Sequence, residues 1–249
     1  MAGHSVVAFK YHARFGHFLC AEASASGLSY PVPSRTALLG LVGAVLGLEK
    51  DSPQELLKGA EFAVHGVKPV THWHTAKFRK DPPDTLSWTV RRGAKGTSKN
   101  EKATLPSQEW LFNPSYVIIS YLPDEYHSEF VRRLKTKEHF YTPCMGLSEM
   151  LAHLDFVDEG IAESTGEDEI INSLTLVRAD CATFDVSKVI SEGKRLDVHL
   201  ISLPRDVTVD RGFTHADYIY ETMGRPISVR TSHGWRVTID GDIKEFMYL

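Results

Sequence analysis

A basic stretch between residues 77 and 102 has the composition of a nucleic-acid contact. It holds eight Lys and Arg residues and three acidic residues over 26 positions, a net charge of +5. Basic side chains bind phosphates, and an aromatic side chain such as Trp88 stacks on unpaired bases. A solvated charged loop is the alternative, but the position between two expected strands favours RNA contact. We assign that contact to Lys77, Arg79, Lys80, Trp88, Arg91, Arg92, Lys95 and Lys99.

Two of the twelve histidines have a spacing that is found in metal sites. His72 and His74 flank Trp73, so a strand would place both imidazoles on one face. A zinc site needs a third protein ligand from elsewhere, and His65 is a candidate without further support. We therefore expect a strand edge that faces RNA or solvent, with no metal and no cofactor.

Four residues near the N-terminus are candidates for RNA cleavage: Lys10, Tyr11, His12 and His17. Cleavage without a metal requires a base for the 2′-hydroxyl, an acid for the leaving oxygen and a cation for the phosphate. Aromatic and histidine side chains on a strand and its exit loop also occur without catalysis. We favour a binding protein and keep a metal-independent endoribonuclease as the alternative.

The composition is that of an ordinary globular protein. The chain has 249 residues, 42% of them hydrophobic and 24% charged, which allows one large domain or two small ones. No apolar run approaches the length of a membrane-spanning helix, and no signal peptide is evident. Three widely spaced cysteines without a Cys-x-x-Cys pair exclude a disulfide framework. We expect a soluble cytoplasmic protein with no membrane partner.

The charge is distributed unevenly along the chain. Residues 1–144 carry 18 basic and 13 acidic residues, whereas residues 145–249 carry 10 and 19. Such polarity is typical of a protein with one face toward a polyanion. Chance clustering on a mildly acidic protein is the alternative.

The elements that must position these residues follow from hydrophobic patterns and turn residues. Ser34 is a suitable N-cap for a buried helix, in which Gly40, Gly43 and Gly47 require close packing by a neighbour. We expect strands over 5–11, 61–70 and 116–121, and helices over 35–48 and after Asp124. A terminal hairpin of 235–239 and 243–248 should follow.

Two later segments are expected to be less regular. Met145 begins a turn that leads into a short helix, and residues 155–169 hold seven acids and no basic residue. The acidic run indicates an exposed loop and a subdomain boundary. The order of elements fits a β-α-β-β-α-β unit. RNA-recognition modules share that topology, although topology does not establish function.

Two segments resemble signatures of a known family. The string YPVPSRTALLGLVGAVLG at 30–47 resembles the N-terminal signature of the CRISPR-associated Cas-five proteins of the RAMP superfamily. The string YTPCMGLSE at 141–149 resembles their second, glycine-containing motif. The insertion between the two is where this family has a β-hairpin thumb. The resemblance covers the first 150 residues and is closest to the type I-B subunit.

The resemblance implies a non-catalytic RNA-binding subunit of a type I CRISPR interference complex (Cascade) in antiviral defence. Such a subunit caps the 5′ handle of the crRNA, contacts the backbone and large subunits, and meets target DNA indirectly. It adds Arg14, Tyr30 and Arg35 to the expected RNA contacts. Because one branch of the family processes CRISPR repeat RNA, a metal-independent endoribonuclease with that substrate is the alternative.

The patterns and the resemblance together predict the fold class α+β. We expect a ferredoxin-like (RRM-like) domain over 1–158, with an inserted β-hairpin thumb at about 75–112, and a β-rich C-terminal region over 170–249.

Overall fold

The computed structural model describes most of the chain. The described residues are 3–20, 26–75, 78–79, 103–104, 106–185, 187, 195–208, 210 and 212–249. Over these residues the protein is mostly β-structure. No described helix is long and apolar enough to cross a membrane.

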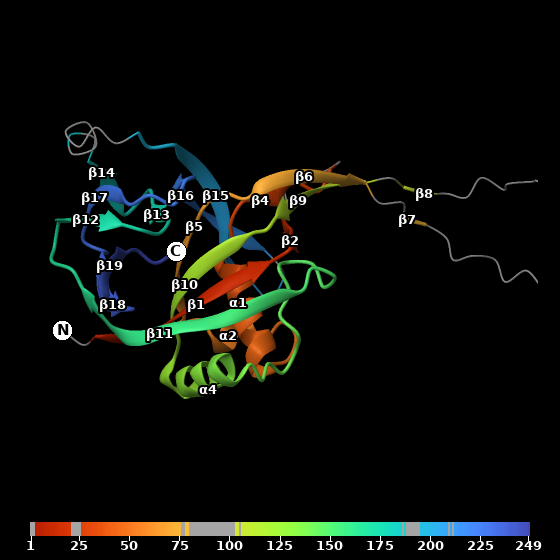
Figure 1. Ribbon diagram of the computed structural model, residues 1–249, viewed down its shortest axis with the longest axis horizontal. Helices are drawn as coiled ribbons and strands as arrows, with labels where there is room; N and C mark the ends of the chain where they lie inside the picture. Colours follow the sequence, from red (N-terminus) through yellow and green to blue (C-terminus); the bar gives the residue numbers. More distant parts are fainter. Residues whose placement is uncertain are drawn as a thin grey trace, which may run out of the picture.

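The main sheet has six antiparallel strands (Figure 1), in the order β19-β18-β11-β1-β10-β5. Four strands of this sheet, β1, β5, β10 and β11, are interspersed with two helices along the chain. The elements in chain order are β1 (His4–Ala13), α1 (Arg35–Leu46), β5 (Glu61–Gly66), β10 (Ser115–Tyr121), α4 (Asp124–Thr136) and β11 (Ala152–Ser164). The last two strands, β18 (Trp235–Ile239) and β19 (Asp242–Phe246), form the hairpin that the sequence predicts, and β18 pairs with β11.

Helix α1 begins after the predicted N-cap and ends before the predicted C-terminal residue. The Ser34 hydroxyl accepts a hydrogen bond from the Ala37 N–H at 3.3 Å, which satisfies one of the free donors of the first turn. Gly47 ends the helix with a φ of +81°, in the left-handed region that glycine adopts at little cost. The helix is therefore slightly shorter than the predicted 35–48.

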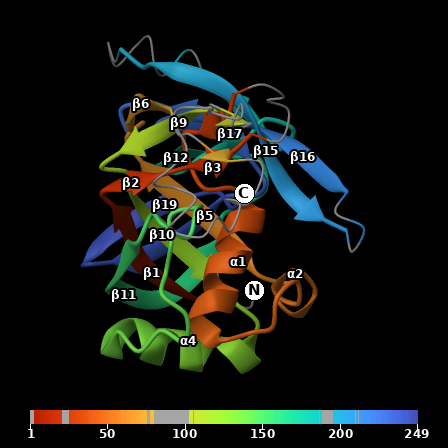
Figure 2. The same ribbon diagram turned by 90° about the vertical axis from the view of Figure 1, so that its right-hand side faces the viewer.

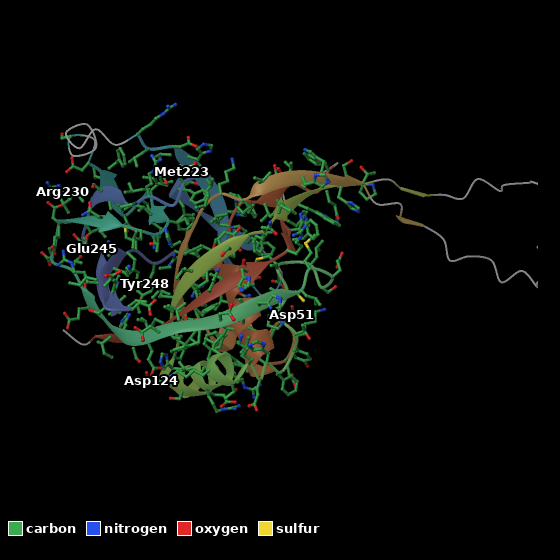
Figure 3. All side chains as sticks on the ribbon, in the orientation of Figure 1. Asp51, Asp124, Met223, Arg230, Glu245 and Tyr248 are labelled. Atoms are coloured by element: carbon green, nitrogen blue, oxygen red, sulfur yellow. The ribbon has the colours of Figure 1, made fainter. Side chains whose placement is uncertain are left out.

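The main sheet packs apolar side chains on both faces. Helices α1 and α4 lie on one face of the sheet (Figure 2), where Phe9, Leu38 and Phe130 are buried in one cluster. On the other face, Val6 of β1 packs with Phe246 of β19. Tyr248, near the end of the chain, belongs to this second cluster and lies beside β18 and β19 (Figure 3). The C-terminal strands thus complete the core of the N-terminal sheet.

Further strands form two small sheets beside the main one. Their orders are β12-β17-β14 and β13-β16-β15. The strands are β12 (Glu169–Ser173), β13 (Val177–Arg178), β14 (Ala182–Phe184), β15 (Val198–Val207), β16 (Phe213–Glu221) and β17 (Ile227–Thr231). A third apolar cluster, which includes Ile171 and Val229, lies within this region. The division into 1–158 and 170–249 stays a prediction.

A three-stranded sheet of order β2-β9-β6 lies at the end of the molecule away from α4 (Figures 1 and 2). It consists of β2 (Phe15–Gly16), β6 (Val70–Thr75) and β9 (Ser107–Phe112). Beyond it, β7 (Phe78–Arg79) pairs with β8 (Ala103–Thr104). The paired strands form the base of the predicted thumb, and its middle part lies outside the described residues. The short strands β3 (Phe18–Leu19) and β4 (Ser29–Tyr30) and the helix α2 (Pro53–Leu56) complete the elements named here.

Three predictions about these elements are wrong. The expected strand 61–70 is two strands in different sheets, because β5 ends at Gly66 and β6 begins at Val70. Most of the expected acidic loop is β11, and two of its acids pair with lysines at the C-terminal end of α4, as in the 2.9 Å contact of Lys137 Nζ with Asp155. The segment after Met145 is a turn without a helix.

Candidate nucleic-acid interface

The two signature segments border one groove of about 760 Å³. Its lining includes Gly40 and Gly43 of α1, Tyr141 and Gly146 of the second segment, and Phe213 of β16. The groove therefore lies where α1, the turn at 146 and the β15-β16 hairpin meet. Sequence reasoning identified both signatures but not the groove that they share.

Gly146 lets the second signature approach the backbone of His17, between β2 and β3. Its φ is +87°, and a Cβ at this position would overlap the His17 carbonyl oxygen. The His17 N–H donates to the Met145 carbonyl at 3.0 Å. Only glycine meets both the backbone conformation and the close approach, so the glycine of this motif has a structural role.

The three glycines of α1 have different environments. A Cβ at Gly43 would overlap the Pro53 ring, and one at Gly47 would overlap the Phe140 ring. The prediction of close packing is confirmed at these two positions. It is wrong at Gly40, where a Cβ would meet nothing within 4 Å among the described residues. Gly40 instead lines the groove.

Arg35 is buried and its guanidinium bonds within the protein. Nη1 donates to the Asp206 carboxylate at 2.7 Å, and Nη2 donates to the carbonyls of Lys58 and Ala60 at 2.7 and 2.8 Å. These contacts join the start of α1 to β15 and to the segment before β5. Arg35 thus has a structural role, and its contact with RNA stays a prediction.

The other residues that we expect to contact RNA differ in their exposure to solvent. Tyr30 is buried on β4 and pairs with Phe18. Arg14 is exposed at the end of β1, and its Cζ lies 4.8 Å from the centroid of the Phe112 ring. Arg79 lies in β7. The remaining predicted contacts lie outside the described residues: Lys77, Lys80, Trp88, Arg91, Arg92, Lys95 and Lys99.

The candidates for RNA cleavage do not converge. The Tyr11 hydroxyl is buried on the helix side of the sheet and donates to the Cys144 carbonyl at 2.6 Å. Burial raises the pKa of this phenol well above its ordinary value. Alternation along β1 places Lys10 and His12 on the opposite face. The four residues therefore form no single site.

The two histidines among these candidates have separate partners. His12 Nε2 lies 2.7 Å from the Asp155 carboxylate, and Lys137 and His12 hold the pKa of Asp155 at about 2. His17 is buried, and its Nδ1 lies 2.8 Å from the Glu109 carbonyl, a contact that requires the proton on Nδ1.

The imidazoles of His72 and His74 share one strand face, as the spacing predicts, without a third ligand. His74 stacks on Trp110 at 3.9 Å between ring centroids, and His65 Nε2 lies 3.0 Å from the Gly224 carbonyl. Within the part of the chain that the structure describes, no three His, Cys, Asp or Glu side chains gather as metal ligands.

Sequence reasoning missed the aromatic side chains around Arg14. Phe15, Trp110 and Phe112 approach one another at the base of the hairpin. The alternation of Trp110 and Phe112 within 107–112 was the available signal, since residues two apart share a strand face.

Comparison with known proteins identifies the family. A family model described as CRISPR-associated protein (Cas_Cas5) matches residues 7–236. The chain belongs to this Cas-five family. The resemblance seen in the sequence is thereby confirmed at the level of the family, and the type I-B assignment stays a prediction. No curated protein sequence matches this chain.

Solved structures with similar folds have low sequence identity to this Cas-five protein. A chain from a "CRISPR RNA-guided surveillance complex" has a TM-score of 0.51 and 13% identity, over 92% of this chain and 91% of that one. A "CRISPR protein from Archaeoglobus fulgidus" has a TM-score of 0.46 and 13% identity, over 98% and 99% of the two chains. The first comparison supports a shared fold.

Proposed function

We propose that this protein is a non-catalytic RNA-binding subunit of a type I CRISPR interference complex, closest to type I-B. In that role it caps the 5′ handle of the crRNA and contacts the backbone and large subunits. The family match over residues 7–236 carries the proposal. The fold similarity to a chain of an RNA-guided surveillance complex supports it.

The proposed fold class is ferredoxin-like, with the thumb inserted between the second and third strands of the unit. The strand order β11-β1-β10-β5 and the alternation with α1 and α4 support this assignment. The hairpin of β6 and β9 begins after β5 and ends before β10, which is the position of the insertion.

Electrostatics supports an RNA partner for the hairpin. The sequence between residues 77 and 102 has a net charge of +5, and phosphate contacts by Lys and Arg release counterions from the nucleic acid. Binding through this segment is therefore strong at low salt and weakens as salt increases.

The arrangement of the cleavage candidates supports binding without catalysis. A cleavage site requires its base, acid and cation within reach of one phosphate. Tyr11 instead donates inside the core, and His17 is buried with its Nδ1 at the Glu109 carbonyl. We therefore favour the non-catalytic subunit over an endoribonuclease.

The test is charge reversal in the hairpin. We expect Arg91→Glu with Arg92→Glu to weaken binding of single-stranded repeat RNA at least about tenfold at low salt, and to reduce the salt slope by about 1.4. Fluorescence anisotropy at several salt concentrations measures both quantities.

A matched control is Arg230→Glu with Lys244→Glu, which changes the net charge equally. Arg230 lies at the end of the molecule away from β6 and β9 (Figure 3). We expect a smaller loss for this control. Equal losses in both variants, or unchanged affinity in the hairpin variant, would contradict the proposal.

A further inference from the structure

One face of the β2-β9-β6 sheet carries a row of rings that ends in a cation. The register places His72 opposite Trp110 and Val70 opposite Phe112. Because side chains alternate along a strand, these four residues and His74 share a face. We call this surface, together with Phe15 and Arg14 beside it, the ring face.

The rings of this face contact one another in sequence. His74 stacks on Trp110 with an interplanar angle of 23°. Phe15 lies 5.5 Å from Trp110 and 5.8 Å from Phe112, between ring centroids. The Arg14 guanidinium then lies over Phe112 at 4.8 Å. The row is an imidazole, an indole, two phenyl rings and a guanidinium.

The ring face is a surface, whereas the opposite face of the same sheet enters the core. Leu111 of β9 points the other way and is fully buried in the main cluster. On the ring face, Arg14 and His72 are exposed and Val70 is 72% exposed. The rings of Phe15 and Trp110 are only partly buried.

The charge of the ring face is positive. The described ion pairs do not include Arg14. Glu109, the acid of β9, lies on the opposite face, where its carboxylate accepts from the Ser29 N–H at 3.1 Å. Aromatic rings beside a guanidinium that forms no ion pair among the described residues favour a ligand with flat rings and negative charge.

We propose that the ring face binds unpaired nucleotides of a single-stranded nucleic acid. A base stacks on the imidazole surface of His74 that Trp110 does not cover, and the Arg14 guanidinium contacts a phosphate. The inference rests on the proposed RNA-binding function and gives that function a second contact surface, at the base of the hairpin.

The test compares variants of the ring face with a control on the opposite face of β6. Anisotropy of a fluorescein-labelled single-stranded repeat RNA is measured with His74→Ala, Arg14→Gln and the control Trp73→Ala. Trp73 lies between the two histidines on the opposite face and is 53% exposed. We expect His74→Ala and Arg14→Gln each to weaken binding about fivefold or more. The control should stay within about twofold of the wild type.

Two further measurements separate stacking from altered folding. His74→Phe retains a flat ring and should restore most of the affinity that His74→Ala loses. A duplex RNA of the same sequence should bind the wild type and His74→Ala equally, because paired bases are not free to stack. Failure of the phenylalanine rescue, or an equal loss on the duplex, would overturn the stacking role.

A single-stranded DNA of the same sequence identifies the ligand more closely. Equal losses on DNA and RNA identify the base and phosphate, whereas a loss on RNA alone identifies the ribonucleotide; either supports the site. Unchanged RNA affinity in both variants, or a loss equal to that of Trp73→Ala, overturns the inference and leaves the proposed function intact. A wild-type protein that binds no RNA overturns both.

Discussion

The Arg35 guanidinium contacts two segments that are distant from it in the sequence. Its partners are Asp206 of β15 and the carbonyls of Lys58 and Ala60. The sequence marks Arg35 as a basic residue in a signature and predicts an RNA contact. The burial of Arg35 depends on β15, in which Arg205 lies 170 positions later in the chain. No local sequence pattern therefore reveals that burial.

Arg35→Met is expected to lower the free energy of unfolding by about 2–4 kcal/mol, because the buried carbonyls lose their donor. Asp206→Asn should cost less than about 1 kcal/mol, since that carboxylate is 56% exposed and screened by solvent. Urea denaturation of both variants measures the difference. Equal costs would show that the ion pair, rather than the buried carbonyl contacts, accounts for the role of Arg35.

At the scale of elements, Gly40 and Gly43 provide a matched pair within α1. Gly43→Ala should lower the free energy of unfolding by about 1–3 kcal/mol, because the Pro53 ring must move. Gly40→Ala should raise it by about 0.5–1 kcal/mol, because alanine favours the helix and the position is open. Urea midpoints test both. Destabilisation by Gly40→Ala would contradict the open environment.

Helix α4 is joined to α1 by Arg133, which also pairs with a carboxylate of its own helix that titrates at low pH. Glu129 accepts hydrogen bonds from Arg132 and Arg133, which lower the pKa of Glu129 to about 2. Arg133 also donates to the Val45 carbonyl at 3.0 Å. A carboxyl with a lowered pKa stabilises the fold above its ordinary pKa of 4.5, and this contribution is lost as the pH falls toward 2.

Glu129→Gln should therefore lower the thermal midpoint at pH 7, and the difference from the wild type should shrink between pH 4.5 and about 2. Glu125→Gln removes an exposed charge from the first turn of the same helix and serves as the control. Thermal melts at pH 7 and about pH 3 measure the effect. A difference that is the same at both pH values would contradict the ion-pair explanation.

The sequence predicts more of the elements than of their arrangement in the whole molecule. The cap at Ser34, the strand at 116–121 and the terminal hairpin are local signals, and the structure contains all three elements. Strand β11, which pairs with β1 and β18, was missed because its run of acids is typical of a loop. Two of those acids pair with lysines at the end of α4, as in the Lys135–Glu159 contact of 3.1 Å, and only the tertiary structure brings these residues together.

Part of the uneven charge distribution along the chain is also explained by ion pairs within the protein. The acidic excess in residues 145–249 includes Asp155 and Glu159, which face basic residues of the N-terminal part. The site was less predictable than the fold. The ring face needs residues from β2, β6 and β9 together, and the local signals, the histidine spacing and the alternation of Trp110 and Phe112, do not show that these strands meet.

The most direct test of the central claim is incubation of the purified protein with labelled repeat RNA in the absence of metal, followed by paired native and denaturing gels. An RNA without the 5′ handle is the control. We predict a shifted band with intact RNA, and a weaker shift without the handle. A shorter product on the denaturing gel, or equal shifts with and without the handle, would contradict a non-catalytic subunit that caps the crRNA 5′ end.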